Sequence, residues 1–458
     1  MPTISQRGID MPASPIRKLV PLANKAKAKG IKVYHLNIGQ PDLETPEVAL
    51  RAVHHLERKV LEYSPSEGIL SFREKLVGYY QKFNIDVCTD DIIITTGGSE
   101  AVFFSFMACL DPGDEIIVPE PAYANYMAFA ISCGAIIKTI ASTIEEGFAL
   151  PSVEKFEALI TPRTKAILIC NPNNPTGYLY TRKEMNQIRD LVKKYDLFLF
   201  SDEVYREFCY TGAPYISAFH LEGIENNVIL VDSVSKRYSE CGIRIGALIT
   251  KNKQVRENVM KWCQARLSPP LIGQIMAEAS LDTPEEYMRE VYDEYVERRK
   301  FLIDGINRIP GCYSPIPMGA FYTVAKLPVD DADKFCAWCL EDFEYEGQQF
   351  LWLLPPDSTR LRVWGKMNPF SLCPEKRRLG KALIVLEKSL GILSKKIKSK
   401  IIEASIYKQY KFINENHRSD TRQYFQKLVD YGCSPDLGFF YSDGLQHDRH
   451  VMAGTSGK

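Results

Sequence analysis

Short apolar and β-branched runs recur through the middle of the chain, and a stretch long enough for a helix follows most of them. The runs are Ile92–Thr95, Ile116–Val118, Ala166–Ile169, Phe198–Ser201, Val228–Val231 and Ala247–Thr250. Strands that alternate with helices favour a mainly parallel sheet with helices on both faces. We therefore predict an α/β fold in which functional residues lie at the carboxyl ends of the strands.

The pattern changes after the last of these runs. Two proline-containing turns, at 269–270 and 283–284, interrupt it, and a charged helical stretch follows from Glu285 to Asn307. We expect residues 46–284 to form a large domain, and residues 1–45 together with 285–392 to form a smaller α+β domain. Residues 374–392 have the pattern of an amphipathic helix. Residues 393–458 lack a sustained period, which predicts a poorly ordered tail.

Charge and cysteine content narrow the class of protein. The 57 lysine and arginine residues balance 57 aspartate and glutamate residues, which argues against nucleic acid or an anionic membrane as a partner. No apolar stretch approaches the roughly 20 residues of a membrane helix, and the first residues lack a signal-peptide core. Cys336 and Cys339 form a pair, but no second pair follows at metal spacing. We expect reduced thiols, no metal and a cytoplasmic location.

One lysine directly follows a strand-like apolar run and is surrounded by small polar residues. Lys236 lies in the segment 232–246, whose sequence is DSVSKRYSECGIRIG. A lysine in this setting suits covalent attachment to pyridoxal 5′-phosphate (PLP), with Ser233, Ser235 and Arg244 at the phosphate. The alternative is a solvated lysine at a strand end, and two further motifs make that the weaker interpretation.

The two motifs also follow apolar runs. Asn174 belongs to CNPNNPTG at 170–177, where each proline forces extended backbone before it, so a rigid loop would aim this amide at the phenolic oxygen of PLP. Asp202 ends LFLFSD and could keep the pyridinium nitrogen protonated. Tyr205 would join Asn174 at the phenolic oxygen. The alternative for Asp202 is an N-cap of the next helix.

A fourth segment offers an anion site. The sequence IIITTGGSEA at 92–101 runs from a strand through two glycines into an apolar helix. Backbone N–H groups at a helix N-terminus favour an anion, so Gly98 and Ser99 are candidates for the phosphate. Farther on, Tyr123 could stack on the pyridine ring, and the alternative is a packed loop tyrosine.

Taken in order, these motifs resemble the class I aminotransferases of PLP fold type I, and among them the bacterial aspartate aminotransferases. The resemblance covers about Met11 to Gln348. It implies the PLP transferase fold with a sheet of the seven-stranded type, PLP as cofactor, and Lys236 as the residue that binds PLP and moves a proton. It adds Tyr63, which would reach the phosphate in a neighbouring subunit. It also adds Gly39 at the substrate carboxylate, with Asn174 beside the same substrate.

The resemblance further implies a homodimer that acts on an amino acid and a 2-oxo acid. The expected reaction is ping-pong transfer of an amino group from aspartate or a similar donor to 2-oxoglutarate. Two alternatives stay open. One is another enzyme of the same fold, such as a lyase or a racemase. The other is a PLP-binding homologue with impaired catalysis.

The second alternative is prompted by a departure from the family after Gln348. Family members place there a strand whose arginine binds the substrate α-carboxylate. Counted without gaps, that arginine falls at about Phe370, whereas the candidate Arg362 is displaced by several positions and could equally be an edge-strand charge. One permitted codon choice for FLWLLPPDSTRLRVWG at 350–365, read from its third base, gives the family-like SMAPASGFYSTPGMG. Our hypothesis is that residues 349–373 are read in a shifted frame.

Overall fold

The computed structural model describes residues 2–12, 19–351 and 367–395. The chain separates into two compact units, Met1–Ser389 and Leu390–Lys458. Of the second unit, residues 390–395 are described, and they are helical.

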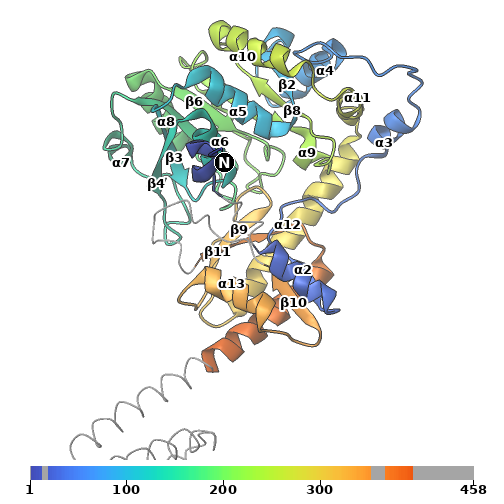
Figure 1. Ribbon diagram of the computed structural model, residues 1–458, viewed down its shortest axis with the longest axis vertical. Helices are drawn as coiled ribbons and strands as arrows, with labels where there is room; N and C mark the ends of the chain where they lie inside the picture. Colours follow the sequence, from blue (N-terminus) through green and yellow to red (C-terminus); the bar gives the residue numbers. More distant parts are fainter. Residues whose placement is uncertain (1, 13–18, 352–366, 396–458) are drawn as a thin grey trace, which may run out of the picture. The chain divides into compact units, whose positions relative to one another are not determined.

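A seven-stranded sheet forms the centre of the first unit, in the order β2-β8-β7-β6-β5-β3-β4 (Figure 1). Only β8 runs antiparallel to its neighbours β2 and β7. The mainly parallel α/β sheet predicted from the sequence is therefore confirmed. The strands are β2 (Ile92–Thr95), β3 (Glu115–Glu120), β4 (Ile136–Ala141), β5 (Thr164–Cys170), β6 (Phe198–Asp202), β7 (Val228–Ser233) and β8 (Gly246–Ile249).

Helices cover both faces of the sheet, and the strands bury side chains on each (Figure 1). Alternate residues face opposite sides: Ile116 and Ile229 pack in one core, whereas Ile117 and Leu230 pack in the other. Strands buried on both faces read as continuous apolar runs, which is why six of the seven strands, all except β4, were predicted from the sequence. The helices are α3 (Glu47–His54), α4 (Leu70–Gln81), α5 (Gly97–Cys109), α6 (Asn125–Cys133), α7 (Val153–Glu157), α8 (Arg182–Tyr195), α9 (Val234–Arg237), α10 (Lys253–Arg266) and α11 (Leu271–Ser280).

Helix α8 illustrates how the local sequence defines these elements. Thr181 accepts a hydrogen bond from the Glu184 amide, and the Glu184 carboxylate accepts one from the Thr181 amide. This capping box satisfies backbone donors that the first turn would otherwise leave unpaired. Met185 and Ile188 then present an apolar face that is buried against the sheet.

The remaining elements form two small sheets and their helices. The long helix α12 (Glu285–Arg308) precedes β9 (Tyr322–Lys326), which pairs antiparallel with β11 (Met367–Ser371). Strand β1 (Lys32–His35) pairs parallel with β10 (Gln348–Leu351), so the N-terminal segment joins the later part of the chain. The other helices are α1 (Gln6–Asp10), α2 (Val20–Ala28) and α13 (Ala332–Glu341), and residues 376–389 are also helical. Among the described residues, no helix combines the length and apolar character needed to cross a bilayer.

Candidate functional site

A cavity of about 310 Å³ opens at the carboxyl ends of β6 and β7. Its walls come from segments far apart in the chain, which the sheet brings to one edge. All the predicted site residues except Tyr63 and Arg362 line it. They are Gly39, Gly98, Ser99, Tyr123, Asn174, Asp202, Tyr205, Ser233, Ser235, Lys236 and Arg244.

Lys236 lies on the single turn of α9, immediately after β7. Ser233 begins that turn, because its hydroxyl accepts a hydrogen bond from the Ser235 amide at 3.2 Å. The half-buried amine of Lys236 donates to the Gly39 carbonyl oxygen at 2.9 Å. It also lies 4.0 Å from the Cys241 sulfur and 5.9 Å from the centre of the Tyr205 ring. The amine is thus held in the cavity, next to the predicted substrate-binding glycine.

Asp202 is the last residue of β6 and is buried. Tyr126 on α6 donates its hydroxyl proton to Oδ2 at 2.6 Å, and the Val204 amide donates to Oδ1 at 3.3 Å. Burial raises the pKa of Asp202 to about 6, although both hydrogen bonds act in the opposite direction. Residues 203–208 contain no helix that Asp202 could cap. Asp202 instead lines the cavity, where a bound cation would strongly favour the ionised form of its carboxylate.

Asn174 and Tyr205 meet on another wall of the cavity, with 3.5 Å between the amide nitrogen and the phenol oxygen. The loop that carries Asn174 is fixed by Asn173, whose Oδ1 accepts hydrogen bonds from the amide and the hydroxyl of Thr176 at 3.1 and 2.9 Å. Burial raises the pKa of Tyr205 well above its usual range, so the phenol keeps its proton. Both groups can therefore act as donors at one point.

The opposite end of the cavity is built for an anion. Helix α5 starts at Gly97, so its first backbone N–H groups and Ser99 lie at the cavity. The exposed Arg244 lies across from it and donates to the Cys241 carbonyl oxygen at 3.0 Å. A Cβ added at Gly97 would lie 2.4 Å from the Arg244 guanidinium, and one at Gly246 would lie 2.6 Å from the Gly98 nitrogen. The backbone atoms around Gly246 leave no room for a side chain there, and Gly97 has a φ of 75°, which favours glycine.

Three residues of this site were not predicted. Tyr126, which bonds Asp202, lies three positions after Tyr123 and contacts its ring edge-on at a centroid distance of 5.4 Å. Tyr123 precedes α6, so helical spacing gave no signal for Tyr126. Tyr322 arrives from β9, and a Cβ at Gly39 would lie 2.0 Å from its hydroxyl. Cys241 approaches Lys236 as described. Nothing local in the sequence places Tyr322 near the lysine.

Two predicted residues are not brought to the cavity. Tyr63 is 76% exposed and does not line it. Arg362 lies outside the described residues. A count without gaps from Gln348 places the family's carboxylate-binding arginine at Phe370. This side chain is fully buried in β11, opposite Thr323 of β9. In the part of the chain that the structure describes, no group of three or more histidine, cysteine, aspartate or glutamate side chains is arranged to hold a metal ion.

Comparison with known proteins identifies the family. Residues 31–363 match the family model for aminotransferase class I and II. The chain belongs to this family. Curated relatives include an aspartate aminotransferase of Thermotoga maritima, 34% identical over 337 residues that make up 72% of this chain and 86% of that protein. An aspartate aminotransferase of Pyrococcus horikoshii is 32% identical over 353 residues, or 74% of this chain and 86% of that protein.

Solved structures agree with this assignment. The aspartate aminotransferase of Thermotoga maritima superposes with a TM-score of 0.77 at 30% identity, covering 85% of this chain and all of that one. An alanine aminotransferase of Pyrococcus furiosus gives 0.78 at 31% identity, with the same coverage. These similarities confirm the predicted aminotransferase fold and make the chain an amino-acid transaminase of a family that uses PLP.

Proposed function

We propose that this protein binds PLP in the cavity around Lys236 and transfers the amino group of an L-amino acid, aspartate or a similar acidic donor, to 2-oxoglutarate. The observation that carries the cofactor assignment is the gathering of Lys236, Asp202 and Arg244 around one cavity. An amine, a carboxylate and a guanidinium from separate segments match the aldehyde, ring nitrogen and phosphate of PLP. The names of the curated relatives favour aspartate as the donor.

The residues that line the cavity fit this cofactor. A phosphate needs donors and positive charge, and the first turn of α5, the hydroxyls of Ser233 and Ser235, and the Arg244 guanidinium supply them. The pyridine ring needs an apolar or aromatic surface, which Tyr123 offers. The protonated ring nitrogen is a cation and needs a carboxylate as its partner, which the buried Asp202 would supply.

When bound, PLP supplies an aldehyde that condenses with amines and a ring that accepts electrons. Lys236 Nζ would hold the cofactor and would carry the proton that leaves the substrate Cα. The Asp202 carboxylate would keep a proton on the ring nitrogen. Tyr205 and Asn174 would donate hydrogen bonds to the phenolic oxygen, and Gly39 would meet the substrate carboxylate through its backbone.

The assembly and domain organisation follow the family pattern. We propose a cytoplasmic homodimer, in which Tyr63 reaches the phosphate of the neighbouring subunit. Residues 46–284 would form the PLP-binding domain, and residues 1–45 with 285–392 the smaller domain. Arg362 remains our candidate for the substrate carboxylate.

A two-substrate rate assay tests the reaction. Aspartate and 2-oxoglutarate should give ping-pong kinetics. Lys236→Ala should lower the rate below about a thousandth of the parent value, because no other group replaces the amine. The control Lys251→Ala removes a lysine that is paired with the exposed Asp86 and should leave the rate unchanged. Release of ammonia or CO2 without an oxo-acid acceptor would indicate a different enzyme of this fold.

One observation favours a second candidate, a PLP-binding protein with impaired catalysis. Phe370, not an arginine, occupies the buried position in β11 at which the family's carboxylate-binding residue was counted. Cofactor absorbance that does not change when amino acids are added would support it. Replacing residues 349–373 with the family segment should then lower KM for the donor about 10- to 100-fold, as a restored charge-assisted contact would. Sequencing the coding DNA tests the frame hypothesis itself.

A further inference from the structure

Each of four residues that line the cavity has a charged neighbour in the chain that does not line it. The pairs are Asp202 with Glu203, Tyr205 with Arg206, Ser233 with Asp232, and Lys236 with Arg237. The charged members come from the ends of β6 and β7. They meet behind the cavity and form what we call the buried ion cluster: Glu203, Arg206, Asp232 and Arg237.

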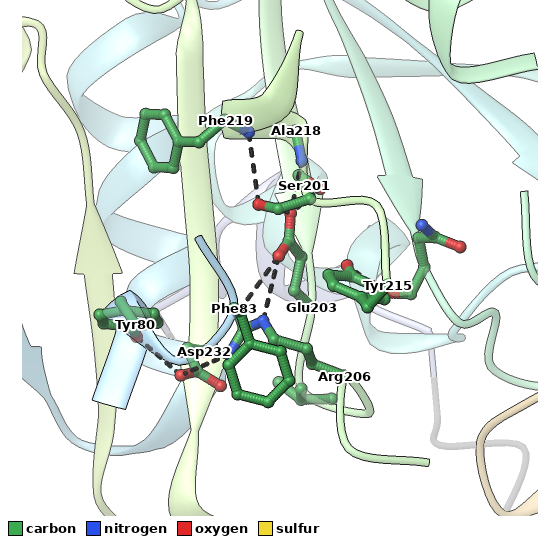
Figure 2. Close-up of polar contacts among 12 residues, drawn as sticks. Tyr80, Phe83, Ser201, Glu203, Arg206, Tyr215, Ala218, Phe219 and Asp232 are labelled. Atoms are coloured by element: carbon green, nitrogen blue, oxygen red, sulfur yellow. Dashed lines mark hydrogen bonds and ion pairs between the residues drawn. The ribbon is translucent and has the colours of Figure 1, made fainter. Parts of the chain in front are cut away.

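Asp232 is the centre of this cluster. Its Oδ2 accepts a hydrogen bond from the Tyr80 hydroxyl at 2.7 Å and lies 3.4 Å from Arg206 Nη1 (Figure 2). Its Oδ1 accepts a short hydrogen bond from Arg237 Nη2. One carboxylate therefore ties the residue that follows Lys236 to a residue that follows β6.

Glu203 extends the cluster to a third segment. Its Oε2 lies 3.2 Å from Arg206 Nη2, while Oε1 accepts hydrogen bonds from the Ser217 hydroxyl and the Ala218 amide, both at 2.9 Å. Figure 2 shows Arg206 between Glu203 and Asp232, with Tyr80 and Tyr215 beside it. The centre of the guanidinium lies 5.2 Å from the Tyr80 ring and 5.8 Å from the Tyr215 ring.

The four members of the cluster are buried, and Arg237 also pairs through Nε with the buried Glu207, whose Oε1 lies 3.2 Å away. The exposed fractions of the side chains are 0% for Glu203 and Arg206, 3% for Asp232 and 1% for Arg237. Burial by itself would raise the pKa of Asp232, but Arg237 and Arg206 lower it to about 2, so this carboxylate stays ionised. A buried charge that loses its partner is strongly unfavourable, so each member resists displacement from the others.

The position of the cluster explains why such a constraint matters. The ladder between β6 and β7 ends at the pair of Asp202 with Val231, and the Glu203 amide adds one hydrogen bond to the Val231 carbonyl oxygen at 2.9 Å. Lys236 lies beyond that end, on a helix of one turn. Backbone pairing between the two strands therefore does not reach the lysine.

We propose that the buried ion cluster is a positioning device that sets the separation between Asp202 and Lys236. Asp232 and Arg237 close the turn that carries Lys236, and Arg206 with Glu203 holds that turn to the end of β6. The roles of Asp202 and Lys236 in this statement rest on the proposed function. The cluster residues themselves do not line the cavity.

The test uses two variants. Arg237→Lys keeps the positive charge but loses the guanidinium that contacts Asp232 and Glu207 at once, and Arg237→Met loses both the charge and these contacts. We expect kcat for transamination to fall about tenfold in the first and about 100-fold in the second, with KM nearly unchanged, because a displaced catalytic group slows the reaction itself. The pH midpoint of the cofactor absorbance should shift in both. Hydrogen–deuterium exchange of residues 232–241 should become faster in both.

The matched control is Arg163→Met. Arg163 pairs with the buried Glu115 at 3.0 Å, at the amino end of β3 and away from the cavity. It should lower stability without changing kcat, the absorbance midpoint or exchange at 232–241. The proposal would be overturned if Arg237→Lys kept the parental kcat, absorbance midpoint and exchange rate at 232–241. If neither Arg237 variant folds, Glu203→Gln, which keeps the side-chain shape, decides by the same criteria. A parent without cofactor absorbance would refute the proposed function, while the exchange measurement would still test the cluster.

Discussion

Among the residues that line the cavity, Asp202 is an acid with only 9% of its surface exposed. Its pKa is raised by burial from an ordinary value of 3.8 to about 6. A raised folded-state pKa means that the folded protein binds the proton more tightly than the unfolded chain. The contribution of Asp202 to the free energy of unfolding is therefore highest below about pH 4 and falls until about pH 6, by about 3 kcal/mol in total, after which it stays level.

This leads to a prediction for the cofactor-free protein. Asp202→Asn should raise the free energy of unfolding by up to about 3 kcal/mol near pH 8, and about half as much near pH 5. Denaturant unfolding of both proteins at the two pH values measures it. The exposed Asp86→Asn serves as control and should show no such trend. The same Asp202 variant should lose most transaminase activity, and a destabilised variant would contradict the argument.

Tyr126 acts on Asp202 in the opposite direction to burial. Its hydrogen bond at 2.6 Å stabilises the carboxylate and lowers the pKa of Asp202. In Tyr126→Phe that pKa should rise further, so the acidic limb of the kcat/KM profile should move to higher pH. Tyr178→Phe, which removes a hydrogen bond to Glu184 at 2.9 Å, is the control. An unchanged acidic limb in Tyr126→Phe would mean that Asp202 does not control this limb.

At the scale of the elements, the sequence was most informative where strands are buried on both faces. β2, β6 and β7 appear as unbroken apolar runs, and the site residues follow them directly. β4 was missed because Lys138 and Thr139 interrupt its apolar pattern and much of the strand is only half-buried. The antiparallel direction of β8 also has no local signature. Tyr322 was not predicted as a site residue because it reaches the cavity only through the packing of β9, far from the other site residues in the sequence.

Strand β8 supports the anion end of the cavity through one glycine. Gly246 is paired with Thr95 of β2 and Ser233 of β7. A Cβ at Gly246 would lie 2.5 Å from the carbonyl carbon of Gly97 and 2.7 Å from the backbone carbonyl oxygen of Asp232. Both are backbone atoms that cannot easily move.

Gly246→Ala should therefore push the start of α5 away from β7. We expect it to lower stability by about 1–3 kcal/mol, as overpacking does, and to weaken PLP binding. Thermal unfolding and cofactor titration measure the two effects. Gly78→Ala on α4 has nothing within 4 Å of the added Cβ and is the control. Parental PLP affinity in Gly246→Ala would show that the spacing of α5 from β8 is not critical for the phosphate.

At the scale of the whole molecule, several apolar side chains around Tyr63 are exposed. Val60 is 68%, Tyr63 76% and Leu267 51% exposed. The Ser66 hydroxyl donates to the Leu267 carbonyl oxygen at 2.6 Å, which holds the two segments side by side. Large exposed apolar side chains that gather in one region indicate a protein–protein contact. A second copy of the chain is the partner that the family resemblance implies, with a twofold-symmetric interface.

The shared-site dimer gives the last prediction. Light scattering should find about twice the 52.1 kDa mass of one chain. Tyr63→Phe should keep that mass, since the ring still packs, but should weaken PLP retention about tenfold through loss of a hydrogen bond to a charged group. Dialysis followed by cofactor quantification measures retention, and Tyr313→Phe, an exposed tyrosine elsewhere, is the control. A stable monomer that holds a full complement of PLP would rule out the shared site, because Tyr63 does not line the cavity of its own chain.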